Sequence, residues 1–288
     1  MSTPEASRQA AEMIIEQSKD MVAAPPVVFK LMGLLKRPNV HNQDVIDIIR
    51  YDENLTAKLL KLCNTAFFRA SVPVDSVDQA ILRLGNSNIL GIVAALSIDA
   101  KSKNKQASYM NPYAIWRQSV TASIAAKHLS EQCRNSQVPT DLAFTAGLLH
   151  NIGMVVLNAC PSEDIAKIIP LAQEKKISLI EAERELLQTD HAEIGGLLVE
   201  RWQLPSNIVE AVKYQHIPDQ SQNPLASLCH LASICAHVSI GTYPSEQLMD
   251  FVYPSVLSTL GIDETSIRAT LQTIQDESSR IEAFMMVA

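Results

Sequence analysis

The residues best suited to chemistry in this chain form a His–Asn pair that is expected to lie inside an otherwise apolar helix. His150 and Asn151 lie within residues 143–153, where most other side chains are apolar or small. A buried polar pair needs hydrogen-bond partners, because an unsatisfied polar group costs about 1–3 kcal/mol. Gly147 and Gly153 flank the pair and allow close approach of a backbone or a ligand. The pair is therefore a candidate binding position, although a single helical histidine is more often a satisfied core residue.

Two further histidines extend this pair into a series along the chain. His191 begins one helical pattern and His216 ends another. Taken singly, each is more often structural than functional. The sequence contains no Walker loop, no G-x-G-x-x-G and no G-x-S-x-G motif. Phosphate-loop and serine-nucleophile chemistry are therefore not expected.

The elements that must position these residues are predicted to be helices throughout. Apolar residues recur at spacings of three and four, as at Val45, Ile48 and Ile49, and alternating strand patterns are hard to find. Residues 178–181 form a capping box, and residues 190–193 resemble one. We therefore predict an all-α, multi-helix fold with no significant sheet.

The helical pattern divides into an extension, two lobes and a tail. The most polar stretch, Lys101–Ser108, is the expected seam between the lobes. The predicted parts are an N-terminal helical extension, 1–20; a first lobe, 21–103; a second lobe, 112–241; and a helical C-terminal tail, 242–288.

Composition and charge argue against several classes of protein. The net charge is −7, and no basic stripe is interleaved with aromatic residues, so nucleic-acid binding is a poor expectation. There is no secretion signal and no apolar run of the roughly 20 residues that cross a bilayer. The 5 cysteines form no CxxC motif and are expected to be reduced, mostly buried thiols. We expect a soluble, cytoplasmic protein without membrane contact.

Several stretches together resemble the HDOD proteins, a bacterial branch of the HD-domain superfamily. The resemblance covers about residues 21–241, including both lobes. The stretches that carry it are Ala24–Leu31, Tyr51–Asn64 and Val77–Gly85 in the first lobe, and Phe144–His150, His191–Gly195 and Trp202–Pro205 in the second.

The resemblance also implies a divalent metal site that this chain retains only in part. Metal-binding relatives use an early His, a His–Asp pair, often two further histidines and a late Asp, which together activate water on a phosphate ester. Here His150, His191 and His216 are retained. Gln118 replaces the early His, Asn151 replaces the Asp of the pair and Ser233 replaces the late Asp. Both carboxylates are lost, so we expect no catalytic residues and no cofactor.

The remaining pocket residues admit several uses. They are Gln118, His150, Asn151, His191, His216 and Ser233. These side chains could hold an anion, a nucleotide or water, or satisfy one another as a buried polar network. If a metal binds, we expect His150, His191 and His216 to hold it.

The resemblance implies a non-catalytic module of bacterial signal transduction that acts through protein–protein interaction. A histidine kinase or a cyclic-di-GMP enzyme is a possible partner, and Phe67–Phe68 is a candidate contact, although these residues are more often core. Two alternatives stay open. One is a metal-dependent phosphohydrolase or phosphodiesterase, and the other is a sensor of a nucleotide or small ligand.

Overall fold

The protein is all-α. The computed structural model describes residues 3–18, 26–35, 40–50, 52–64, 74–85, 89, 92–93, 96, 109–134 and 138–277. Within these ranges every regular element is a helix and there is no strand, which confirms the predicted fold class. The predicted seam 101–108 and the candidate contact Phe67–Phe68 lie outside the described residues, as does the end of the tail after residue 277.

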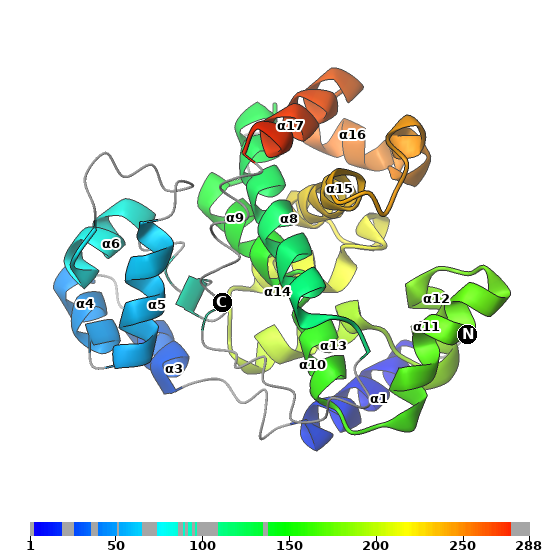
Figure 1. Cartoon of the computed structure of the whole chain (residues 1–288), viewed down its shortest axis with the longest axis horizontal. Coiled ribbons are helices and arrows are strands. Elements are labelled where there is room, and N and C mark those ends of the chain that lie inside the picture. The colour runs from blue at the N-terminus through cyan, green and yellow to red at the C-terminus, as the bar shows by residue number, and fades with distance from the viewer. Residues whose placement is uncertain are drawn as a thin grey trace.

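The described part of the first lobe is a group of short amphipathic helices that pack on one another. Many of their apolar residues at spacings of three and four, such as Val45 and Ile49, are fully buried between them. Figure 1 shows these helices together at one side of the molecule. They are α3 (Pro26–Leu35), α4 (Asn42–Arg50), α5 (Glu53–Cys63) and α6 (Val77–Leu84).

The second lobe is built around one long helix. Helix α8 (Pro112–Gln132) packs against α9 and α15, and α13 packs against α10 and α14. The remaining helices of this lobe are α9 (Thr140–Leu149), α10 (Ile152–Ala159), α11 (Glu163–Lys175), α12 (Leu179–Leu187), α13 (His191–Arg201), α14 (Ser206–Tyr214) and α15 (Pro224–Ser239).

The N-terminal helix packs against the second lobe, although the first lobe follows it in the chain. Helix α1 (Pro4–Gln17) contacts α13 and α10 through its buried face, which includes Ala11 and Ile15 (Figure 1). The Ser7 hydroxyl donates a hydrogen bond to Thr189 Oγ1 at 3.2 Å, two residues before His191. The first helix thus buttresses the start of α13.

The C-terminal segment also packs on the second lobe. Its elements are η3 (Ser245–Phe251), α16 (Pro254–Leu260) and α17 (Glu264–Asp276), which follow α15. The short η2 (Pro218–Gln220) lies before α15, within the second lobe. Helix α16 packs on α15, and α17 packs on both α8 and α15. These contacts place 242–276 on the same body as the histidine-bearing helices.

Within the described ranges, one apolar segment is long enough to cross a membrane but lies inside the fold. Leu142–Ala159 has a mean hydropathy of 1.5, and 83% of it is buried. It comprises most of α9 and all of α10, so it forms part of the hydrophobic core. The cysteines are all free thiols; Cys63, Cys160, Cys229 and Cys235 are buried, and Cys133 is partly buried.

Candidate functional site

The prediction that the His–Asn pair lies inside one helix is wrong, because the pair forms an elbow between two apolar helices. Helix α9 ends at Leu149 and α10 begins at Ile152, so His150 and Asn151 occupy the break between them. Both side chains are buried. The His150 ring donates through Nδ1 to the Gly147 carbonyl oxygen at 2.7 Å. The pair is therefore held in the interior by the turn of chain that precedes it.

Two glycines bring neighbouring helices against this elbow. A Cβ atom on Gly147 would lie 2.7 Å from the Ala122 carbonyl oxygen of α8, and one on Gly153 would lie 1.9 Å from the His191 carbonyl oxygen of α13. Neither distance is possible for a real side chain, so both positions require glycine. The close approach expected from the sequence is made by backbone.

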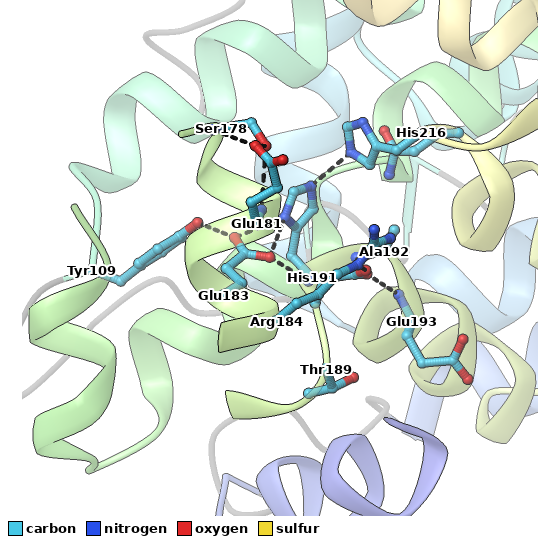
Figure 2. Close-up of polar contacts among 12 residues, drawn as sticks. Tyr109, Ser178, Glu181, Glu183, Arg184, Thr189, His191, Ala192, Glu193 and His216 are labelled. Carbon is cyan, nitrogen blue, oxygen red and sulfur yellow. Dashed lines mark hydrogen bonds and ion pairs between the residues drawn. The ribbon is translucent and has the colours of Figure 1, made fainter. Parts of the chain in front are cut away.

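His191 is oriented by a buried carboxylate. Glu183 of α12 accepts a hydrogen bond from His191 Nδ1 at 2.9 Å and another from the His191 backbone N–H at 2.8 Å. The Tyr109 hydroxyl also donates to Glu183, as Figure 2 shows. Because all three side chains are buried, this carboxylate fixes both the ring and the first turn of α13.

Asp190 caps the same helix beside this cluster. Its Oδ1 accepts hydrogen bonds from the backbone N–H groups of Ala192 and Glu193 at 3.0 and 2.9 Å, and its Oδ2 pairs with Arg184 Nε at 2.7 Å. The capping box that residues 190–193 resemble is only half formed, because the Glu193 carboxylate pairs with Lys213. The box at Ser178 and Glu181 is complete.

His216 and its neighbour Gln215 connect His191 to the elbow. His191 Nε2 and His216 Nε2 are 3.0 Å apart and share a hydrogen bond (Figure 2). The Gln215 amide donates to the His150 carbonyl oxygen at 2.6 Å, and the Gln215 carbonyl accepts from His230 Nδ1 at 2.7 Å. One continuous set of hydrogen bonds therefore links the end of α14 to the elbow and to α15.

The last two predicted positions lie on α8 and α15. Gln118 Nε2 and His237 Nε2 are 2.6 Å apart. Ser233 is buried and shares a face of α15 with His230 and His237, since it lies three residues after one and four before the other. The structure thus brings five of the chain's 7 histidines together in the second lobe, namely His150, His191, His216, His230 and His237. A sixth, His128 of α8, instead contacts Thr270 of α17.

Burial and mutual repulsion keep most of this histidine cluster neutral. Burial, opposed by the Gly147 carbonyl, lowers the pKa of His150 to about 3, and burial lowers the pKa of His237 to about 4. The pKa of His216 lies well below its ordinary value because of burial first and then the neighbouring histidines. His191 differs: burial opposes its charge, but the Glu183 carboxylate raises its pKa above the ordinary value.

The donor set around these histidines does not fit a divalent metal. Among the described residues, no group of three or more His, Cys, Asp or Glu side chains is arranged to hold a metal ion. The Glu183 carboxylate lies behind His191, on its Nδ1 side, where it also accepts a hydrogen bond from Tyr109. Gln118, Asn151 and Ser233 carry amides and a hydroxyl, which supply no negative charge and no general base.

The sequence predicts six positions of this candidate site but not the residues that hydrogen-bond to them or lie beside them. The missed residues are Tyr109, Glu183, Gln215, His230 and His237. The sequence contains two patterns that could have indicated some of these residues. Glu183 interrupts an apolar stripe formed by Leu179, Ile180, Leu186 and Leu187 at helical spacing, and His230 and His237 share a face with Ser233. No local pattern marks Tyr109, whose contact with Glu183 spans 74 residues.

Comparison with known proteins settles the family. The HDOD domain matches residues 21–218, well over half of the chain. The chain belongs to the HDOD family. The match ends before α15, so His230, Ser233 and His237 lie beyond the matched residues.

Several solved structures share the fold of this HDOD protein. An HDOD domain protein of Geobacter sulfurreducens has a TM-score of 0.77 at 22% identity, covering 98% of each chain. A candidate signal transduction protein of Marinobacter aquaeolei has a TM-score of 0.79 at 22% identity, covering 98% of this chain and 66% of its own. A candidate phosphohydrolase of Shewanella amazonensis has a TM-score of 0.73 at 20% identity, covering 95% and 97%. At these identities the likeness establishes the fold alone.

A curated relative comes from Treponema pallidum. It is 26% identical over 269 residues, which is 92% of this chain and 51% of the relative. The chain therefore spans about half the length of that relative.

Proposed function

We propose that this HDOD protein is a non-catalytic regulatory module of bacterial signal transduction that acts by binding a partner protein. The observation that carries the proposal is the chemistry of the histidine cluster. Gln118, Asn151 and Ser233 stand where metal-binding relatives have a histidine and two carboxylates. A divalent ion would meet mostly neutral donors there, and no carboxylate would be free to activate water.

The hydrogen bonds within the cluster support the same proposal. His191 is engaged by Glu183 on one ring nitrogen and by His216 on the other, while Gln118 contacts His237. Side chains that satisfy one another in this way stabilise a specific packing of helices. In this proposal the second lobe is a rigid support, and a partner such as a histidine kinase or a cyclic-di-GMP enzyme binds elsewhere on the protein.

The experiment compares phosphodiester hydrolysis by the natural protein and by a variant in which the ligands of the wider superfamily are restored. The restored variant carries Gln118→His, Asn151→Asp and Ser233→Asp. With added Mn²⁺, we expect no turnover by the natural protein. Turnover by the natural protein that is lost in His150→Ala would instead support a metal-dependent phosphohydrolase.

Partner binding is measured separately. Purified histidine kinases and cyclic-di-GMP enzymes from the source organism are titrated against the protein by calorimetry. Saturable binding to one of them, unchanged in His150→Ala, agrees with a module whose pocket is only structural. Binding to none of them would refute this choice of partner classes.

A further inference from the structure

The chain reaches the second lobe through residues 109–111, which directly follow the predicted seam at 101–108. We call residues 109–111 the entry segment. The Met110 backbone N–H donates a hydrogen bond to Asn158 Oδ1 of α10 at 2.9 Å, and the Asn158 amide nitrogen donates to the Met110 carbonyl oxygen, also at 2.9 Å. Asn111 then caps the N-terminus of α8. The entry segment is therefore fastened to α10 and to the start of α8.

The side chain of Tyr109 carries the entry segment to the histidine cluster. Its ring is buried, and its hydroxyl donates to the Glu183 carboxylate. The same carboxylate accepts from the His191 backbone N–H at 2.8 Å and from His191 Nδ1 at 2.9 Å. On its other side, His191 Nε2 lies 3.0 Å from His216 Nε2. Figure 2 shows the tyrosine, the carboxylate and the two imidazole rings as one continuous series.

Burial makes this series sensitive to the position of each member. The Tyr109, Glu183 and His191 side chains are at most 2% exposed, so water cannot replace a lost hydrogen bond. A buried carboxylate that loses a donor keeps its desolvation cost without the compensating bond. A shift of Tyr109 is therefore expected to move Glu183, and with it both of the hydrogen bonds to His191. The reverse also holds, because a coupling free energy between two sites is reciprocal.

We propose that Tyr109 and Glu183 couple the entry segment to the pair His191–His216, so that the hold on the chain between the lobes and the geometry of this histidine pair change together. The inference deepens the proposed function and rests on it, since a regulatory module must pass a change from one lobe to the other. A partner that pulls on the first lobe alters the His191 ring, and an occupant of the histidine cluster alters the entry segment.

The forward direction is tested by loosening the entry segment and observing the histidines. The protein is labelled with ¹³C at histidine C2, and the ring signals are recorded by NMR at one fixed pH. Asn158→Ala removes the two hydrogen bonds to Met110 and should shift the signals of His191 and His216. Asn158→Asp, which keeps the acceptor for the Met110 N–H, is used if the alanine variant fails to fold. Unshifted signals in both variants would overturn the proposal.

Asn64→Ala is the matched control. The Asn64 amide nitrogen donates to the Val74 carbonyl oxygen at 2.6 Å, and the Val74 backbone N–H donates to Asn64 Oδ1 at 2.7 Å. This is the same two-bond pair as at Asn158, but both of its members lie in the first lobe. We expect Asn64→Ala to leave the His191 and His216 signals unchanged. Equal shifts in the Asn64 and Asn158 variants would contradict a specific coupling.

The route of the coupling is tested by a double-mutant cycle. Tyr109→Phe keeps the buried ring and removes the hydroxyl that reaches Glu183. In this background, Asn158→Ala should shift the His191 signal much less than it does in the natural protein, because the two changes act through one set of hydrogen bonds. The same shift in both backgrounds would show that α10 acts on α13 by packing alone, and would overturn the role of Tyr109.

The reverse direction is tested by amide hydrogen exchange in His216→Ala. The reporter is the Met110 N–H, and the Val74 N–H is its reference, because each donates to an asparagine Oδ1. We expect exchange at Met110 to become about tenfold faster, which is the factor for the net contribution of one hydrogen bond, and exchange at Val74 to stay unchanged. An unchanged Met110 rate, or equal acceleration at Val74, would contradict the coupling.

These outcomes are distinguishable from failure of the proposed function. Mn²⁺-dependent turnover that is lost in His150→Ala would refute the non-catalytic module, whatever the variants of the entry segment show. Absence of coupling in a protein without turnover would remove only the link between the entry segment and the histidine pair.

Discussion

Replacing Gly153 by alanine should weaken the fold at the elbow that carries His150 and Asn151. The added Cβ atom would lie 1.9 Å from the His191 carbonyl oxygen and 2.9 Å from the Gly195 backbone nitrogen. Both neighbours are backbone atoms of α13, so no flexible side chain can move aside. To reach ordinary contact, α10 and α13 must separate by about 1.5 Å in a closely packed interior.

Such a shift is expected to be costly. Overpacking a core costs about 1–3 kcal/mol, and a rigid backbone contact belongs at the upper end, so we expect a loss of about 3 kcal/mol. The variant should also move His191 relative to the elbow, which would weaken its hydrogen bond with His216.

Gly33→Ala is the matched control. Gly33 lies inside α3, and a Cβ atom there meets no described heavy atom within 4 Å. Because alanine favours helix over glycine by about 1 kcal/mol, this variant should be slightly more stable than the natural protein. The assay is guanidinium unfolding followed by circular dichroism, comparing midpoints at constant m-value. If Gly153→Ala is no less stable than Gly33→Ala, the close backbone contact does not exist.

Three further outcomes follow from the same contacts. Stability should fall as pH drops below about 6.5, by roughly 1.4 kcal/mol per pH unit for each histidine kept neutral, since the unfolded chain then binds more protons. The folded pKa values of about 3 for His150 and about 4 for His237 set the lower limit of this pH range. An unfolding midpoint unchanged between pH 7 and 5 would contradict this prediction. The raised pKa of His191 has the opposite effect, since the stability that it contributes is present below about pH 6.5 and is lost at higher pH. Glu183→Gln should lower the His191 pKa measured by NMR titration and cost about 1–3 kcal/mol of stability. An unchanged pKa would refute the pairing of Glu183 with His191. Finally, Ile15→Ala on α1 should cost about 2–4 kcal/mol, because it removes a buried side chain. Arg8→Ala breaks only exposed pairs, with Glu12 and Glu200, and should cost under about 1 kcal/mol. Equal losses in the melting assay would show that α1 is held by charge and not by packing.

Helices and their ends could be predicted from sequence because their causes are local. The apolar spacing of α4 and the capping box at Ser178 and Glu181 require only neighbouring residues, and both occur as expected. The break between α9 and α10 was harder to predict, because it depends on the contact of Gly153 with α13, 38 residues later. A continuous apolar pattern across residues 142–159 gives no sign of that contact.

The resemblance named some of the side chains in the histidine cluster. The side chains that depend on contacts between distant parts of the chain could not be predicted. Gln118, His150, His191 and His216 were identified, and the structure connects each of them to the histidine cluster. The Glu183 carboxylate was missed because acidic side chains in helices usually face solvent, and its burial becomes favourable only when Tyr109 and His191 donate to it. The stacking of Tyr243 on His237 of α15 was not predicted, because it requires a chain reversal at Gly241, with φ of 78°.

The most direct test of the central claim is the metal content of the purified, untagged protein, measured by mass spectrometry. A cluster that lacks both carboxylates should hold far less than one equivalent of any divalent metal, with the same low content in His150→Ala. Near-stoichiometric metal in the natural protein, lost in His150→Ala, would contradict the account and make metal-dependent hydrolysis the function to pursue.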